Sequence, residues 1–340
     1  MSRPAHSEPQ PAHSEPQRAP SGRRPKVLYV MGAGRSGSTI LGVALGNCEG
    51  VFFAGELDKW FAREGAPRRE DPALHAFWRE ALGQVGDVQD VFAARTGWLE
   101  RSSALLDPRK WRTRRRLRAR YRSVSERLYV VVAGLAQATV VVDTSHYPLR
   151  ARELQALDGI ELHLLYLVRD PQSVVASLAR RDVAERRFGT LAANAYLWLT
   201  NGLSLLVFLR QPHERRLLVR HEDFLADPLG VLAQILAGAG AGAGADAGAR
   251  GGKRASVGGA AGSHAAKPDL EHLRTGIAFH GNRLLGEEFV ALSSRPATAA
   301  RGSLLTALLQ SPWRVLFARL TPATHAAVMA ERQAADGRGS

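Results

Sequence analysis

The sequence contains one cysteine, Cys48, and no cluster of cysteine and histidine residues at the spacing of a metal site. A single thiol excludes an internal disulfide framework and is typical of a protein kept in a reducing compartment. Zinc sites are built from several such ligands. We therefore expect neither a disulfide in the fold nor a metal in the functional site.

Long apolar runs are also missing from the chain. The most apolar long stretch, residues 197–209, covers 13 residues and contains Thr200, Asn201 and Ser204. A membrane-spanning helix needs about 20 apolar residues. The first 24 residues are polar and proline-rich, without the apolar core of a signal peptide. These features predict no membrane span and a cytoplasmic protein.

The composition is globular, with polar or glycine-rich interruptions. The 340 residues are 45% hydrophobic and 23% charged, enough for one large domain or two small ones. Within residues 1–24 the heptapeptide Pro-Ala-His-Ser-Glu-Pro-Gln occurs twice, which is typical of a disordered tail. We interpret the Gly/Ala-rich residues 238–266 as a flexible insertion. The folded domain is expected over residues 25–325, followed by a loosely ordered tail at residues 326–340.

Positive charge is concentrated in one segment of a chain whose formal net charge is +14. Residues 101–127 hold eleven Lys or Arg and two acidic residues, and apolar residues recur there and just beyond at Leu117, Tyr121, Val124 and Leu128. This spacing predicts an amphipathic helix with a basic outer face. The face is either an ordinary solvated surface or a docking site for an acidic acceptor. No nucleic-acid-binding module accompanies it, so nucleic acid is not favoured as a partner. The oligomeric state is left open.

Short apolar runs alternate with helical patterns along the rest of the chain, which is typical of a parallel sheet covered on both faces. A glycine-rich turn follows the first run. The sequence therefore predicts an α/β fold with a P-loop-like central parallel sheet flanked by helices on both faces. The expected strands are residues 27–31, 51–54, 139–142, 162–168 and 216–220, and the expected helices are residues 40–45, 57–63, 72–82, 109–138, 148–157, 171–182, 188–210, 222–237 and 303–309.

Polar residues follow the predicted strands. Glu56, residues 143–146, Arg169 and Arg220 lie at strand ends, and so does the glycine-rich turn at residues 32–39. The carboxyl ends of parallel strands share one edge of a sheet, where ligands of such folds bind. We therefore expect these residues to form one site.

The turn fits more than one phosphate-binding pattern. Gly32, Gly34 and Gly37 spell G-x-G-x-x-G, and Glu56 follows 19 residues after Gly37, as in a dinucleotide-binding fold. The same residues spell most of a Walker A loop, but a serine stands in the place of the lysine.

A third interpretation takes Arg35 and its neighbours as the binding unit. Arg35 stands among three hydroxyl residues, Ser36, Ser38 and Thr39, which together make a dense clamp for an anion. A kinase or ATPase loop depends on the lysine that is missing here, although residues 140–143 imitate a Walker B strand. The arginine and the missing lysine favour the anion clamp.

This turn and a second motif resemble those of sulfotransferases that use 3′-phosphoadenosine-5′-phosphosulfate (PAPS), closest to the bacterial and protein-tyrosine-type branch. The second motif is Arg-Asp-Pro at residues 169–171, with Ser177 eight residues after the arginine. The resemblance covers residues 26–289 and implies that Arg169 and Ser177 hold the 3′-phosphate. Arg181, one helical turn beyond Ser177, would face the same phosphate. The first loop, which would hold the 5′-phosphosulfate, comprises Gly34, Arg35, Ser36, Gly37, Ser38 and Thr39.

The resemblance also implies catalytic residues. Glu56 would be the general base that takes the proton of the acceptor hydroxyl. Related bacterial chains often read Asp-Ser-Ser-Lys where this chain reads Asp-Thr-Ser-His, so either Ser145 or His146 would stabilise the developing negative charge. Gly281 and Asn282 resemble the family's late Gly-Asn loop near the nucleotide.

The implied function is transfer of a sulfuryl group from PAPS, as co-substrate and without a metal, to an acceptor hydroxyl. Carbohydrate, a small natural product and a peptide tyrosine are all open as acceptors. The alternatives are a P-loop nucleotide-dependent kinase or NTPase and a non-catalytic nucleotide- or polyanion-binding protein. A dinucleotide oxidoreductase is a further alternative, but it gives no reason for pairing Arg169 with Ser177.

Overall fold

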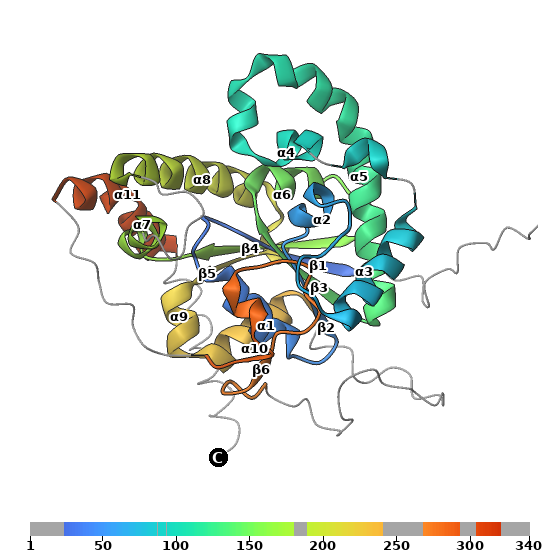
Figure 1. The fold of residues 1–340 in the computed structure, drawn as a ribbon. Coiled ribbons are helices and arrows are strands. Elements are labelled where there is room, and N and C mark those ends of the chain that lie inside the picture. The colour runs from blue at the N-terminus through green and yellow to red at the C-terminus, as the bar shows by residue number, and fades with distance from the viewer. Residues whose placement is uncertain are drawn as a thin grey trace, which may run out of the picture.

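The computed structural model describes residues 24–86, 88–92, 94–179, 189–240, 268–292 and 304–320 (Figure 1). The tail expected before Arg24, most of the expected insertion and the tail expected at residues 326–340 lie outside these ranges. The expectations for those three segments remain predictions.

A five-stranded sheet forms the centre of the fold, in the order β2-β3-β1-β4-β5, and every neighbouring pair is parallel. The predicted α/β architecture is thereby confirmed. The strand predicted at residues 139–142 continues through Asp143 to His146, because its pairing with the first strand persists to Met31. The strands are β1 (Lys26–Met31), β2 (Val51–Gly55), β3 (Val140–His146), β4 (Glu161–Val168) and β5 (Arg216–Arg220).

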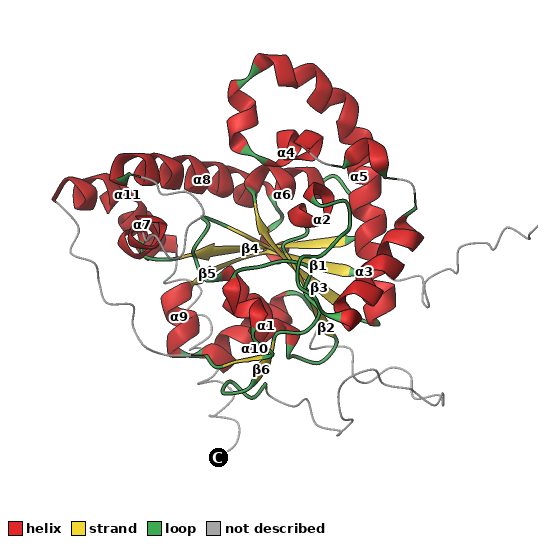
Figure 2. Cartoon of the chain, in the orientation of Figure 1, coloured by secondary structure: helices red, strands yellow, loops and turns green. Residues whose placement is uncertain are grey.

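Helices cover both faces of this sheet (Figure 2). They are α1 (Ser38–Gly46), α2 (Asp58–Ala62), α3 (Pro72–Val85), α4 (Ala94–Glu100), α5 (Pro108–Ala136), α6 (Pro148–Leu154), α7 (Pro171–Ala179), α8 (Thr190–Arg210), α9 (His221–Ala226), α10 (Pro228–Gly238) and α11 (Leu304–Leu320). Short 3₁₀ helices are η1 (Gln89–Val91), η2 (Ser102–Leu106), η3 (His213–Arg215) and η4 (Arg283–Gly286).

The alternation of side chains along the strands divides the apolar core into two layers. In β1, Tyr29 and Met31 point into a core shared with α2, α3, α5, α6 and α8. Leu28 and Val30 point to the opposite face, into a core shared with α1, α9 and α10. Each strand contains a continuous apolar run, not an alternating one, because both of its faces are buried.

Proline explains one difference between prediction and structure. The single helix expected over residues 222–237 is two helices, α9 and α10, because Pro228 has no N–H to continue the first and is well suited to start the second. Asp227 caps the new start: its Oδ1 accepts a hydrogen bond from the Gly230 N–H at 3.0 Å.

Further elements depart from the predictions. The last helix, expected over residues 303–309, is α11, which continues to Leu320 through Pro312. Two short strands, β6 (Leu273–Arg274) and β7 (Phe289–Val290), pair antiparallel and were not predicted. Two residues are too few to show an alternating pattern.

Helix α8 contains a longer apolar stretch than the 13 residues identified in the sequence. Its stretch from Leu191 to Arg210 is, by length and composition alone, apolar enough to cross a membrane, and somewhat under half of it is buried. A core helix passes the same test. In the fold, α8 packs against α6, α7 and α11 (Figure 1).

A buried ionic network joins Asp143 of β3 to Arg150, whose side chain is fully buried. Its Nη2 atom lies 3.2 Å from Asp143 Oδ2 and its Nη1 atom lies 3.1 Å from Glu100 Oε1. The Nη2 group also donates to the Tyr129 hydroxyl at 3.1 Å. One guanidinium thus connects α6 with β3, α4 and α5.

Replacing Arg150 with methionine keeps a long unbranched side chain but leaves the Asp143 carboxylate buried without its cation. We expect the free energy of unfolding to fall by about 3–5 kcal/mol, measured by urea denaturation followed by circular dichroism. Arg112→Met, at an exposed position of α5, is the matched control and should change this free energy by less than about 0.5 kcal/mol. Equal changes in the two variants would contradict the role given to Arg150.

Candidate active site

The glycine-rich turn places the start of α1 at the carboxyl edge of the sheet. Gly37 precedes the helix in a left-handed conformation, with φ of 92°, and no side chain caps the first turn. A Cβ atom at this position would lie 2.9 Å from the His221 ring, so only glycine fits. The uncapped N–H groups of Ser38 and Thr39 are therefore available to an anion, and the helix dipole favours one.

The two motifs predicted to bind phosphate meet in space. Arg35 Nε donates a hydrogen bond to Ser177 Oγ at 3.2 Å, and Arg169 Nη1 donates to the Arg35 carbonyl at 3.2 Å. Ser177 belongs to α7, which Asp170 caps by accepting from the Ser173 N–H at 3.0 Å. Arg181 lies outside the described residues. The structure therefore brings together Arg35, Arg169 and Ser177.

The apolar face of α7 packs against α8 and the glycine-rich turn. Val174, Val175 and Leu178 contact Ala33 of the turn and Leu197 of α8. Helix α8 thus supports both α7 and the turn. The tertiary position of α8, which local spacing does not encode, decides this contact.

Two residues at the turn were not predicted as site residues. Tyr196 on α8 accepts a hydrogen bond from the Gly34 N–H through its hydroxyl at 3.1 Å. His221, at the end of β5, packs on Gly37, and its Nδ1 atom is buried without a partner among the described residues. Burial, helped by Arg169, lowers the pKa of His221 to about 4, so its ring is neutral. The strand-end position of His221 was a usable sequence signal, whereas Tyr196 had none.

The remaining residues of the first loop have different surroundings. Ser36 is buried, and its hydroxyl donates to the Ala33 carbonyl at 2.7 Å, so it closes the turn. Thr39 is buried beside the late glycine loop: a Cβ atom at Gly281 would lie 3.3 Å from Thr39 Cγ2. Asn282 lies in the same loop, where its Oδ1 accepts from the Leu284 N–H at 2.9 Å and caps η4.

Glu56 lies at the end of β2, opposite this late loop. Its N–H donates to the His280 carbonyl at 2.8 Å, and its Oε2 lies 3.1 Å from His280 Nδ1. Gly55, with φ of 81°, permits the approach, because a side chain there would collide with the His280 carbonyl. The contact joins two segments more than two hundred residues apart in the chain.

The surroundings of Glu56 keep its carboxylate ionised. Burial by itself raises the pKa of Glu56, but the hydrogen bond from His280 and the charges of His146 and Lys59 outweigh burial, and the net pKa is lowered. A general base must be unprotonated at the operating pH. Glu56 meets that requirement at neutral pH.

The two candidates for charge stabilisation, Ser145 and His146, occupy different environments. Ser145 is fully buried, and its hydroxyl donates to Asp143 and accepts from the Asp58 N–H at 3.0 Å. His146 is partly exposed, and a Cβ atom at Gly34 would lie 4.0 Å from its Nε2 atom. The hydroxyl of Ser145 is thus used in structural hydrogen bonds, while His146 borders the glycine-rich turn.

A lysine that was not predicted stands near the same edge. Lys59 Nζ lies 2.9 Å from Asp58 Oδ2 and 5.9 Å from the centre of the Tyr147 ring. Nearby carboxylates and Tyr147 raise the pKa of Lys59 against the effect of burial, which lowers it. Lys59 therefore carries a positive charge beside Glu56.

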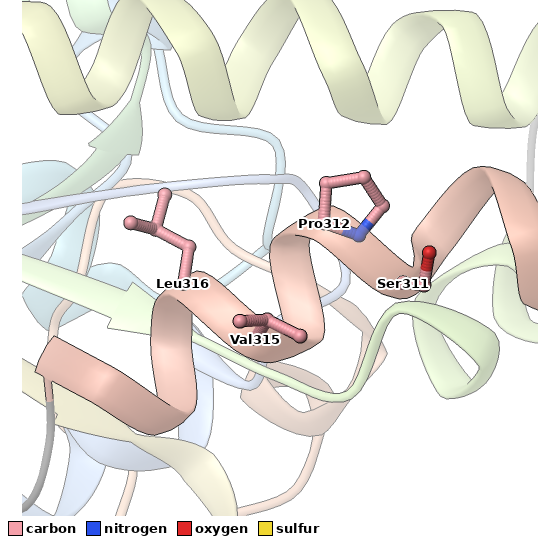
Figure 3. A pocket seen from close by; sticks show the side chains of 4 residues that line it. All are labelled: Ser311, Pro312, Val315 and Leu316. Carbon is pink, nitrogen blue, oxygen red and sulfur yellow. The ribbon is translucent and has the colours of Figure 1, made fainter.

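A shallow pocket elsewhere is unrelated to these residues. It is lined by Ser311, Pro312, Val315 and Leu316, all on α11 (Figure 3). None of the predicted site residues lines it. Within the ranges that the structure describes, no group of three or more His, Cys, Asp or Glu side chains could hold a metal ion.

Replacing His280 with alanine removes both the hydrogen bond and the nearby imidazole, which lower the pKa of Glu56. We expect that pKa to rise, measured by NMR titration of the Glu56 carboxyl carbon. His272→Ala is the control, because His272 is exposed in the same segment and contacts Asp269 instead. A Glu56 pKa that moves equally, or not at all, in both variants would disprove the coupling.

The lowered pKa of Glu56 makes the free energy of unfolding depend on pH. The folded-state pKa of Glu56 lies below the value in the unfolded chain, about 4.3. Glu56 therefore stabilises the fold above that pH, and the stabilisation is lost as the pH falls through the lowered pKa.

One family model and several solved structures are similar to this chain. The family model described as "Sulfotransferase family" matches residues 27–242, more than half of the chain. No curated protein sequence matches the chain. Among solved structures, the sulfotransferase domain from the curacin biosynthetic pathway is 20% identical, with a TM-score of 0.39 over 64% of this chain and 74% of that chain.

Two other solved structures are similarly distant. The sulfotransferase domain of the Synechococcus PCC 7002 olefin synthase is 18% identical, with a TM-score of 0.39 over 66% of this chain and 76% of that one. Sulfotransferase STF1 from Mycobacterium tuberculosis H37Rv is 15% identical, with a TM-score of 0.41 over 64% and 68%. These likenesses are too weak to assign residue roles. On the family match, the chain belongs to the sulfotransferase family.

Proposed function

We propose that this protein transfers a sulfuryl group from PAPS to the hydroxyl of an acceptor molecule. One observation carries the proposal: Arg35 is bonded to Ser177 and to Arg169, so the two predicted phosphate-binding motifs form a single cationic edge. Glu56 and His146 lie at the ends of the neighbouring strands β2 and β3. A donor with two separate anionic groups and an acceptor hydroxyl both have suitable partners there.

The residues present fit such a donor. His221, which packs against Gly37 at the start of α1, presents a buried nitrogen without a partner among the described residues. The N–H groups at the start of α1, with Arg35, would hold the 5′-phosphosulfate. Arg169 and Ser177 would hold the 3′-phosphate, because a guanidinium and a hydroxyl both donate to phosphate oxygens. When bound, PAPS supplies the sulfuryl group and the leaving phosphate.

Glu56 would accept the proton of the acceptor hydroxyl. Its carboxylate is ionised and oriented by His280, whose carbonyl also fixes the Glu56 backbone. A carboxylate with a lowered pKa is a weak base, so positioning of the hydroxyl contributes more to the rate than basicity does, by analogy with phosphoryl transfer.

Between the two candidates for charge stabilisation, we assign the role to His146. The Ser145 hydroxyl already donates to Asp143 and accepts from the Asp58 N–H, so it has no hydrogen left to donate. His146 borders the glycine-rich turn and affects the pKa of Glu56. Lys59 would add a positive charge beside Glu56, the proposed base.

Arg169→Ala and Ser177→Ala test the donor site. Each removes one donor to the 3′-phosphate, so binding of the product nucleotide PAP should weaken by about 1–3 kcal/mol, measured by isothermal titration calorimetry with EDTA present. Ser173→Ala is the matched control, because Ser173 lies on the same helix but contacts Asp170. Unchanged PAP affinity in both test variants would refute the 3′-phosphate assignment. Tight binding of Mg-ATP instead of PAP would favour a kinase or NTPase.

Glu56→Gln tests the base. The amide preserves the shape of the side chain but cannot accept a proton, so transfer to the acceptor should fall by ~10²–10⁴-fold with PAPS binding intact. Turnover is measured with labelled PAPS and a panel of hydroxyl acceptors. The control variant is Glu70→Gln, because Glu70 is exposed. Retained turnover in Glu56→Gln would assign the base to another residue.

A further inference from the structure

A row of arginines on α5 faces the neighbouring helix α6 rather than solvent alone. Arg114, Arg118 and Arg122 are spaced four residues apart and therefore lie on one side of α5. The basic segment was expected to present its charges on an outer face, but Arg114 is only 6% exposed. This part of the expectation is wrong, because α5 packs against α6 along that side.

Within the described residues, one carboxylate, that of Glu153, is bound by arginines of this row. Glu153 of α6 is almost fully buried, and Arg118 Nε lies 3.0 Å from its Oε1 atom. Arg122 Nη2 lies 2.8 Å from the Oε2 atom of the same carboxylate. Each oxygen of Glu153 thus lies next to the guanidinium group of one arginine.

Arg114 has one guanidinium nitrogen without a partner in the described part of the chain. This nitrogen, Nη1, is buried. Burial and the guanidinium groups of Arg118 and Arg152 lower the pKa of Arg114, while Glu153 acts in the opposite direction. Arg152, on α6, is exposed and therefore accessible from solvent.

We infer that Arg114, Arg118, Arg122 and Arg152 form a binding site for a phosphate group between α5 and α6. Guanidinium forks match the oxygens of phosphate, and a buried guanidinium is costly unless an anion accompanies it. Arg118 and Arg122 contact the Glu153 carboxylate, and Arg114 interacts electrostatically with Arg118, Arg152 and Glu153, so positive charge exceeds negative charge in the cluster. A phosphate group carries about one negative charge as a diester and close to two as a monoester, and its free oxygens accept hydrogen bonds from more than one guanidinium.

The site is separate from the proposed donor site. Glu153 lies six residues along α6 from Tyr147, about 9 Å of helix rise, and none of its arginine neighbours belongs to the glycine-rich turn or to α7. The inference therefore does not rest on the proposed sulfuryl transfer. The phosphate could be free or the head group of a phospholipid, and the experiments below distinguish the two.

The first experiment measures the melting temperature of the protein against inorganic phosphate, with chloride used to keep ionic strength constant. A ligand that binds the folded state raises the melting temperature by an amount that increases with the logarithm of its concentration relative to its Kd. We expect Arg152→Gln, at an exposed position that should not disturb folding, and Arg114→Gln to weaken apparent phosphate affinity by at least about tenfold. Each variant is compared with its own phosphate-free baseline, so a change in stability does not affect the result.

Two controls locate the phosphate. Arg116→Gln removes the same charge from an exposed position of α5 outside the cluster and should leave the affinity unchanged. Arg169→Ala changes the proposed donor site and should retain the phosphate-dependent rise in melting temperature that Arg152→Gln loses. Equal responses in all variants, or loss in Arg169→Ala alone, would overturn the inference.

The second experiment identifies the source of the phosphate. The full chain is sedimented with phosphatidylcholine vesicles prepared with and without phosphatidylglycerol. Binding to the anionic vesicles that is lost in Arg152→Gln but not in Arg116→Gln assigns the site to a lipid head group. A phosphate response without vesicle binding assigns it to a soluble phosphate compound. Vesicle binding that is equal in both variants counts against the site as the lipid contact.

Discussion

The site depends on one buried carboxylate, that of Asp143, and on the cation that accompanies it. Arg150 compensates the charge, and Tyr129 donates to the same carboxylate. The other oxygen accepts from the Ser145 N–H at 2.8 Å and from the Leu57 N–H at 3.4 Å. Because Leu57 follows Glu56 directly, the end of β3 fixes the segment that carries the proposed base. A buried ion pair of this kind favours folding only when its remaining hydrogen-bonding groups are satisfied, and here several donors satisfy them.

Around that anchor, the site is assembled from segments far apart in the chain. The order β2-β3-β1-β4 puts the ends of four strands side by side, which brings Glu56, His146, the glycine-rich turn and Arg169 to one edge. The late loop then closes over Glu56 through two contacts from His280. The same layout separates two roles of arginine: Arg35 and Arg169 gather at the edge, whereas the α5 row gathers around Glu153. These two groups of arginine residues therefore lie at different places and have different partners.

Strands and motifs could be predicted because their signals are local. Strand β5 has the bounds that its apolar run indicates, and Asp170 caps α7 as its position before Pro171 suggests. The break at Pro228 was missed although proline gives a local reason for it. The pair β6 and β7 could not be found, since each strand has two residues and its partner lies fifteen or more residues away. Tyr196 could not be found either, because a tyrosine within an apolar helix carries no sign of the loop it will contact.

The sequence by itself determined the parallel α/β fold, because apolar periodicity acts within one element. It also predicted phosphate-binding roles for the glycine-rich turn, Arg169 and Ser177, from motifs and from the family that they resemble. The tertiary structure alone decided that the Ser145 hydroxyl is used in the interior, that His280 lowers the pKa of Glu56, and that Arg114 Nη1 is buried without a hydrogen-bond partner in the described part of the chain. Each of these depends on which distant groups are packed against a side chain, because desolvation and hydrogen bonding are set by the neighbours and not by the residue.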